Sequence, residues 1–203
     1  MCIRDRNPTE QDFEKLKKLF FKSFQQLHSD EQLIVISYLL NYTSAEMKKG
    51  NSYAYTQAFE LFKFGIKHQI FIGEDGYLSP TKFTNIVVVG CRIKKFDWVE
   101  NFIKKSTSYL NPKHNENTVL VAQACLRFEE KKFKQVIAIS STILFKDDYF
   151  SLRTRAMVLC SYYELYHKNN QQLIQDYCKA YACLLYTSPS PRDATLSRMP
   201  SSA

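Results

Sequence analysis

Histidines and paired acidic residues are the side chains of this sequence that could perform acid–base chemistry, and their placement argues against a catalytic site. Glu129 and Glu130 are neighbours in the chain, as are Asp147 and Asp148. Consecutive residues of a helix do not face each other, so neither pair can act as acid and base on one substrate. The histidines lie far apart in different segments. They are His28, His68, His114 and His167. We therefore expect no catalytic residue and no enzymatic activity.

The cysteines give no sign of a metal site. Apart from Cys2 and Cys183 near the ends, the chain holds Cys91, Cys125, Cys160 and Cys178. No pair has the close spacing of zinc ligands, and no cysteine has a histidine at a suitable distance. Cys91, Cys125 and Cys160 lie among apolar residues of predicted helices, so we expect small buried side chains in a reduced compartment. This predicts a cytoplasmic protein without metal or cofactor.

Polar side chains at exposed helix positions are the remaining candidates for a functional site, and they would bind a partner. The formal net charge is +8, with lysine and arginine dispersed along the chain. A dispersed surplus is usually a solvated surface, and a binding site for nucleic acid or an acidic partner is the less common alternative. The candidate binding residues lie beside apolar stripes on three predicted helices. They are Asn85, Arg92, Gln123, Arg127 and Arg155.

The elements that would position these residues form an internal repeat. Three turns resemble one another: Cys91 to Phe102, Phe128 to Ile139, and Leu165 to Asp176. Val99, Val136 and Leu173 occupy the same place in each turn and are 37 residues apart. A fixed period of this size is typical of stacked helix pairs. Glycine and proline are scarce, at 5 and 6 residues, which also favours helices.

Helical periodicity also precedes the repeated turns. The first predicted helix carries Phe13, Leu16, Leu19, Phe20 and Phe24, and the second Leu33, Ile36, Tyr38, Leu39 and Tyr42. Both sets recur at the spacing of one helix face, so we expect them to be buried. The predicted helix-starting residues are Asn7 or Thr9, Ser29 with Gln32, Ser79 before Pro80, and Asp97. Each can cap a helix or fit its first turn.

The repeat predicts an all-α fold, a right-handed α-solenoid of antiparallel helix hairpins with about nine helices. One helical-repeat domain is expected over residues 7–182. Its units are expected near residues 31–70, 80–111, 116–146 and 150–182. Ala58 precedes Val99 by 41 residues, so the first unit carries a longer connection, which lies in the loop around Gly73 and Gly76.

The aligned turns, together with YTQAFELF (Tyr55 to Phe62), resemble tetratricopeptide repeats. The likeness covers most of residues 29–182, but the period exceeds the usual value of about 34 residues, and Val99 and Val136 stand where that family has a small residue. The string from Asn85 to Ile103 is also similar to bacterial helical-repeat proteins of uncharacterised function. These resemblances imply a fold, and they assign no functional residue.

Both ends of the chain resemble translated sequencing-adapter sequence. Met1 to Arg6 and Cys183 to Asp193 back-translate into complementary strands of one transposon end used in DNA library preparation, and the last residues to Ala203 also read as adapter. We therefore expect residues 1–6 and 183–203 not to be native, with the latter disordered. Residues 7–182 would then be a fragment, and a signal peptide could not be read from this sequence.

These observations predict a non-catalytic scaffold that binds a protein or peptide. The longest apolar run, Ile86 to Gly90, is too short to span a membrane, so no membrane partner is expected. RNA binding is the alternative, because helix pairs can read one base each. It is less favoured, because Lys82, Asn85 and Arg92 align with the unlike residues Val119, Ala122 and Glu129.

Overall fold

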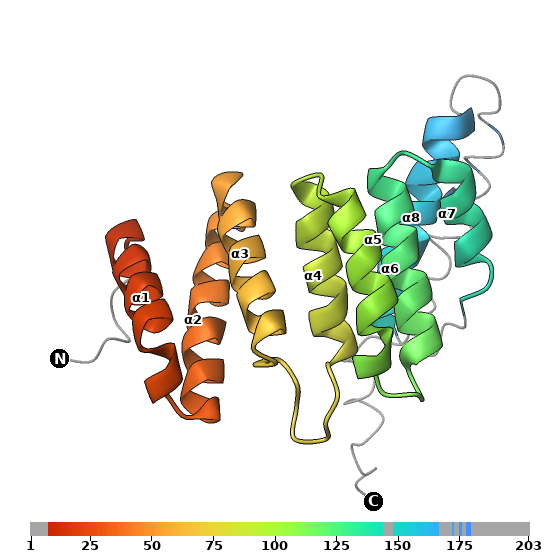
Figure 1. Cartoon of the computed structure of the whole chain (residues 1–203). Coiled ribbons are helices and arrows are strands. Elements are labelled where there is room, and N and C mark those ends of the chain that lie inside the picture. The colour runs from red at the N-terminus through yellow and green to blue at the C-terminus, as the bar shows by residue number, and fades with distance from the viewer. Residues whose placement is uncertain (1–7, 144–147, 167–171, 173–174, 176–177, 180–203) are drawn as a thin grey trace, which may run out of the picture. The chain divides into compact units, whose positions relative to one another are not determined.

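The described part of the protein is all-helical. The computed structural model describes residues 8–143, 148–166, 172, 175, 178 and 179. Within these residues it has eight α-helices, two short 3₁₀-helices and no β-strand, only one isolated bridge between Ile72 and Leu78 (Figure 1). The chain divides into two compact units, residues 1–130 and 131–203, and each is described by itself.

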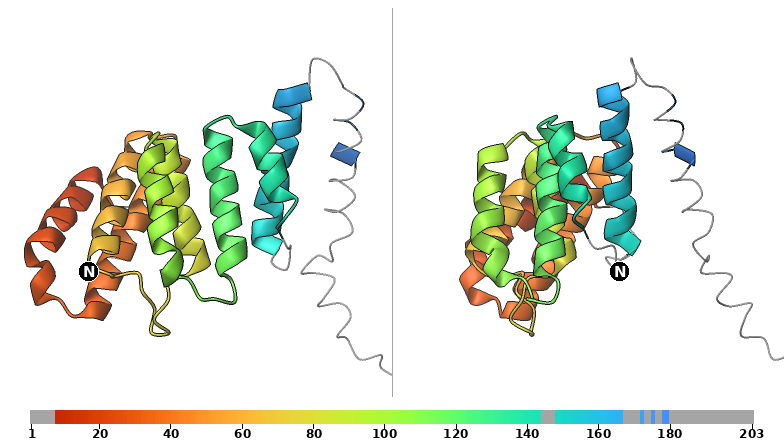
Figure 2. Two further views of the ribbon diagram at one scale, coloured as in Figure 1. Left: turned by 45° about the vertical axis from the view of Figure 1, so that its right-hand side comes forward. Right: turned by 90° about the vertical axis from the view of Figure 1, so that its right-hand side faces the viewer.

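The first unit contains six α-helices, each packed against the next in chain order (Figures 1 and 2). They are α1 (Glu10–Ser23), α2 (Ser29–Lys48), α3 (Tyr53–Lys67), α4 (Pro80–Arg92), α5 (Phe96–Ser106) and α6 (Asn115–Glu129). The 3₁₀-helix η2 (Phe24–Gln26) follows α1, and η3 (Thr107–Tyr109) follows α5. Helix α4 also packs extensively against α6, two helices further along the chain. Helix α4 is therefore covered by both α5 and α6.

Local capping fixes where these helices begin. The Thr9 hydroxyl accepts a hydrogen bond from the Asp12 backbone N–H at 3.2 Å. The Ser79 hydroxyl accepts from the Lys82 N–H at 3.2 Å, with Pro80 in the first turn of α4. Both starts agree with the sequence prediction, since these side chains satisfy N–H groups that lack an intrahelical partner.

Two predicted helix starts were wrong by one or two residues. Helix α2 begins at Ser29, so His28 and not Ser29 is the N-cap, and the Glu31 carboxylate accepts a hydrogen bond from the His28 N–H at 2.9 Å. Gln32 instead donates from its side chain to the carbonyl of Leu27. Helix α5 begins at Phe96, so Asp97 lies inside its first turn. A negative charge there stabilises the helix, because it interacts favourably with the positive end of the helix dipole.

In α4 and α5 the core of the first unit is the stripe that the repeat predicted. Phe83, Val87 and Cys91 of α4 are buried, as is Val99 of α5. Gly90 lets these two helices approach closely, because a Cβ atom added there would lie 2.5 Å from the Val99 Cγ2. The tetratricopeptide-like position that should carry a small residue therefore holds valine, and the facing helix supplies glycine instead.

The outer helices depart from the prediction. Leu16 and Leu19 of α1 are 36% and 60% exposed, and Leu33 and Tyr38 of α2 are 41% and 62% exposed. Phe13, Phe20, Ile36 and Leu39 are buried, as expected. The apolar residues of α1 and α2 cover more of each helix than the neighbouring helices bury, so the prediction that both whole stripes are core was wrong.

The second unit contains α7 (Phe133–Ser140) and α8 (Asp148–Tyr166), which pack against each other. Val136 and Ser161 are fully buried, and Met157 is 8% exposed, as the 37-residue period predicted for inward positions. Cys160 is exposed and not buried, because the inward stripe of α8 passes through Thr154, Met157 and Ser161 and leaves residue 160 on its flank.

The described residues form eight α-helices, where about nine were predicted for the chain. The predicted ninth helix was centred on Leu173 and Tyr177, which lie outside the described residues. No helix in the described part of the chain combines the length and hydrophobicity that crossing a lipid bilayer would require.

Candidate functional site

Two of the predicted binding residues share an exposed face of α4. Asn85 and Arg92 are separated by seven residues, about two helical turns, and both are exposed. Thr81, also exposed, and the half-buried Val88 lie on the same stripe. The Asn85 side chain forms no hydrogen bond with any described residue. Its amide is therefore free to donate to and accept from a ligand.

Arg92 connects this stripe to α6 through a loose ion pair. Its Nε lies 3.5 Å from the Glu129 Oε1, and the Arg92 side chain remains 56% exposed. An exposed pair of this length contributes little to stability, about 0–1 kcal/mol. The guanidinium can therefore turn toward a ligand carboxylate at small cost.

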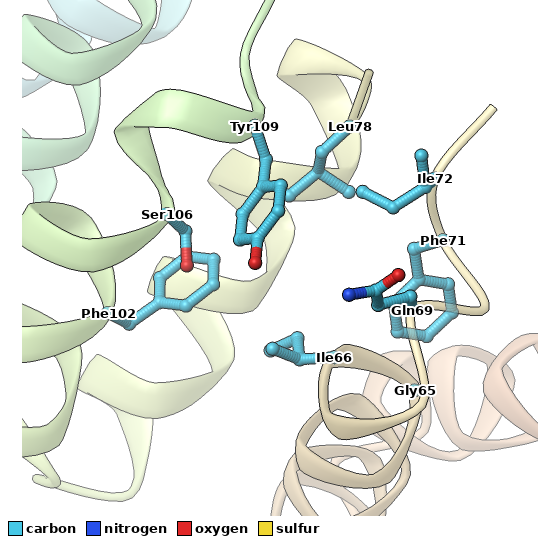
Figure 3. A pocket seen from close by; sticks show the side chains of 9 residues that line it. All are labelled: Gly65, Ile66, Gln69, Phe71, Ile72, Leu78, Phe102, Ser106 and Tyr109. Carbon is cyan, nitrogen blue, oxygen red and sulfur yellow. The ribbon is translucent and has the colours of Figure 1, made fainter. Parts of the chain in front are cut away.

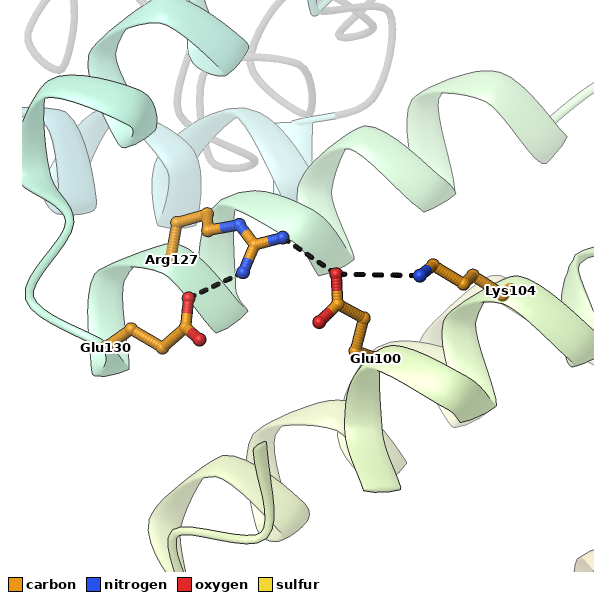
Figure 4. A network of polar contacts seen from close by, with 4 residues as sticks. All are labelled: Glu100, Lys104, Arg127 and Glu130. Atoms are coloured by element: carbon orange, nitrogen blue, oxygen red, sulfur yellow. Dashed lines mark hydrogen bonds and ion pairs between the residues drawn. The ribbon is translucent and has the colours of Figure 1, made fainter. Parts of the chain in front are cut away.

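Arg127, by contrast, is held by two carboxylates (Figure 4). It donates from Nη1 to the Glu130 Oε2 at 2.6 Å and from Nη2 to the Glu100 Oε1 at 3.0 Å. Glu100 also lies 3.9 Å from the Lys104 Nζ. The hydrogen bond that Arg127 donates to Glu130, with the one that it donates to Glu100, raises the pKa of Arg127 above its ordinary value. Arg127 therefore fastens α6 to α5.

The four predicted binding residues of the first unit consequently do not form one surface. Asn85 and Arg92 lie on the exposed face of α4, whereas Gln123 is half-buried on α6, one turn from Arg127. Arg127 and Glu129 are two positions apart, so they point about 200° apart, the first toward α5 and the second toward α4. Arg155 lies half-buried on α8 in the second unit.

A small cavity that sequence reasoning missed lies where the connection after α3 meets α5 and η3 (Figure 3). Its volume is about 20 Å³, enough for one water molecule and far below that of a cofactor site. Its walls include Phe71, Leu78 and Phe102, with polar groups from Ser106 and Tyr109. The sequence signal for it was the longer spacing between Ala58 and Val99, because the extra residues form this connection.

Lys82 lies beside this connection at the start of α4. Its Nζ is 5.0 Å from the centre of the Phe71 ring, and it pairs with no acid among the described residues. Burial lowers the pKa of Lys82 below its ordinary value. The charge of Lys82 is also unfavourable at this position, because the N-terminus of a helix carries a partial positive charge.

Three of the four histidines lie in the described part of the chain. His28 precedes α2, His114 precedes α6, and both are exposed. His68 packs against Phe24 and Phe64, with ring centroids 4.6 and 4.4 Å away. His167 lies outside the described residues. No group of three or more potential metal ligands occurs in the part of the chain that the structure describes.

Comparisons of this chain with models of protein families, with curated proteins and with solved structures give no match. The functional interpretation consequently depends on the geometry of the described residues.

Proposed function

We propose that the protein is a non-catalytic helical-repeat scaffold that binds a peptide segment of another protein along the exposed face of α4. The observation that carries this proposal is the exposed stripe with an unpaired amide at Asn85 and a loosely paired guanidinium at Arg92. We also propose that the helix pairs form a right-handed, tetratricopeptide-like solenoid. The packing of each helix on the next, and of α4 on α6, supports that arrangement.

The chemistry of the stripe indicates what the peptide carries. An exposed arginine favours a carboxylate, because two parallel hydrogen bonds can form between the two groups. Asn85 lies two turns away and can hydrogen-bond to the backbone of an extended peptide. The half-buried Val88 between them offers an apolar contact. The ligand is therefore expected to be a peptide with an acidic residue and an apolar residue nearby.

A selection from a phage-displayed random peptide library on the immobilised full chain tests this proposal. Selected peptides should be enriched in Asp or Glu, and fluorescence anisotropy should show that Arg92→Ala and Asn85→Ala each weaken binding of a synthetic copy about tenfold. Arg127→Gln is the matched control, because Arg127 is already occupied by Glu100 and Glu130. No enriched peptide, or equal binding by the Arg92 and Arg127 variants, would contradict the proposal.

A further inference from the structure

Two segments of the first unit repeat the same local structure. Helix α1 continues through η2 to Leu27, and helix α5 continues through η3 to Leu110. Leu27 has φ −89° and ψ 140°, and Leu110 has φ −86° and ψ 143°. Each leucine donates its N–H to the carbonyl three residues earlier, at 3.3 and 3.1 Å. A further helix follows each leucine, so α1–η2–α2 corresponds to α5–η3–α6.

This correspondence aligns individual side chains. Leu27 and Leu110 are 83 residues apart, and the same shift places Leu16 on Val99 and Leu19 on Phe102. On α5 these positions are covered by α4. Val99 faces Gly90, and the Phe102 ring lies 4.9 Å from the Phe83 ring. Val99 and Phe102 are accordingly 0% and 5% exposed.

On α1 the matching positions lack such a cover. Leu16 and Leu19 are exposed, as noted above, and α2, which packs against α1, also exposes apolar residues. Phe13 stacks on Tyr42 with ring centroids 4.7 Å apart, which sets the pairing of these antiparallel helices. One and two turns from Tyr42 toward the N-terminus of α2 lie Tyr38 and Ile34, which are 62% and 58% exposed. We call Leu16, Leu19, Ile34 and Tyr38 the α1–α2 patch.

Positive charge flanks the α1–α2 patch. Lys15, Lys18 and Lys22 of α1 are exposed, and none pairs with an acid among the described residues. Lys17, whose side chain points to the other flank, is bound to Glu60 of α3 at 2.8 Å. A partner with acidic residues beside its apolar face would complement this rim.

We propose that the α1–α2 patch docks an amphipathic helix of another polypeptide, in the place that α4 takes on α5 and α6. The spacing of Phe83, Val87 and Gly90 on α4 shows the apolar stripe that such a helix needs: two large residues, then a small one. Acidic residues on its flank would meet Lys15, Lys18 and Lys22. This surface differs from the exposed face of α4, so it does not depend on the peptide binding proposed above.

Two synthetic helical peptides test the docking site. The first carries Phe, Val and Gly at the spacing of Phe83, Val87 and Gly90, with glutamates on its outer positions, and a side-chain staple holds it helical because short helices are marginal in water. The second is identical except that lysines replace the glutamates. Fluorescence anisotropy with the full chain should show the glutamate peptide binding at least tenfold more tightly, with a Kd on the order of 10 μM.

Variants then locate the binding site. Leu19→Glu should weaken binding of the glutamate peptide by about tenfold or more. Leu152→Glu on α8 is the matched control, since Leu152 is 50% exposed and lies outside the patch, and it should bind normally. Replacing Lys15, Lys18 and Lys22 by glutamate should reverse the preference between the two peptides. Circular dichroism melting should be unchanged in every variant, because all these side chains are exposed.

Several results would overturn the proposal. One is equal binding of the two peptides, and another is equal weakening by Leu19→Glu and Leu152→Glu. A third is a chain that binds neither peptide but self-associates in sedimentation, with Leu19→Glu abolishing the association, because a second copy would then be the occupant. Loss of peptide binding in Arg92→Ala but not in Leu19→Glu would likewise assign the peptide to the face of α4.

Discussion

Helices α1 and α5 have the same local design and different surroundings, and the comparison separates what local sequence controls from what neighbours control. Both helices end in a 3₁₀ turn and an extended leucine with nearly identical backbone angles. Yet Phe102 is buried under α4, whereas Leu19 at the matching position is 60% exposed. Backbone geometry is thus set within the segment, while burial depends on whether a third helix packs alongside.

The two segments also differ in how their helices are fastened. Helix α6 is tied to α5 by Arg127, which bridges Glu100 and Glu130. Helix α2 is joined to α1 by the stacked rings of Phe13 and Tyr42. The same helix–turn–helix geometry is therefore compatible with either polar or aromatic contacts at the junction.

The largest predicted difference between the segments concerns Phe102 and Leu19. Phe102→Ala should lower the free energy of unfolding by about 3–5 kcal/mol, because it removes a buried ring that contacts Phe83 and Trp98. Leu19→Ala should change it by less than about 0.5 kcal/mol, because the side chain is mostly in water. Trp98, the single tryptophan, reports unfolding of the first unit by its fluorescence in urea.

Equal losses of stability from these two substitutions would contradict the difference in burial between Phe102 and Leu19. They would mean that Leu19 is covered in solution, by a second copy or by another part of the chain. Repeating the measurement at several protein concentrations separates those two causes, because only association depends on concentration.

The 37-residue period predicted inward residues correctly in the repeated helices α4, α5 and α7. Phe83, Val99 and Val136 are buried as expected. Helical spacing within α1 assigned Leu16 and Leu19 to the core as well, and wrongly. Periodicity identifies an apolar face, but it carries no information on whether another helix covers that face.

The candidate site shows a similar limit. Sequence spacing placed Asn85 and Arg92 on one exposed face, and the structure has them there. Sequence spacing could not show that Arg127 is occupied by an ion pair while Asn85 and Arg92 are not firmly held, because the partner of Arg127, Glu100, is 27 residues away and lies on another helix. Long-range ion pairs and the cavity beside Phe71 depend on tertiary packing, which spacing along one helix does not encode.

A second prediction concerns the close approach of α4 and α5 at Gly90. Gly90→Ala should lower the free energy of unfolding by about 1–2 kcal/mol, since the overlap with Val99 exceeds the gain of about 1 kcal/mol in helix propensity. In a Val99→Ala background the same change should be neutral or stabilising, because the overlap is gone. Urea unfolding of the four chains of this double-mutant cycle measures the coupling.

Leu16→Phe is the matched control, because Leu16 occupies on α1 the place of Val99 on α5. It should change stability by less than about 0.5 kcal/mol, since Leu16 is 36% exposed and a larger ring can extend into solvent. Additive effects of Gly90→Ala and Val99→Ala would show that the close approach of α4 and α5 is not what fixes glycine at this position.

The smallest predicted effect concerns Lys82, at the start of the covering helix. Lys82→Met should raise the free energy of unfolding by about 0.5 kcal/mol at neutral pH, because it removes a desolvated cation from a helix N-terminus and keeps an apolar contact with Phe71. Lys63→Met is the matched control: Lys63 is exposed in α3, with its Nζ 5.9 Å from the Phe59 ring centre, and its replacement should leave stability unchanged.

The pH dependence distinguishes desolvation from packing as the cause. The pKa of Lys82 is lower in the folded chain than in the unfolded chain, so between these two values the unfolded state binds more protons and stability rises with pH. The advantage of Lys82→Met should thus be complete at neutral pH and vanish as the pH rises through the lowered pKa toward the ordinary lysine value. An advantage that persists unchanged in alkaline solution would show that methionine merely packs better on Phe71, and that the charge at the start of α4 is harmless.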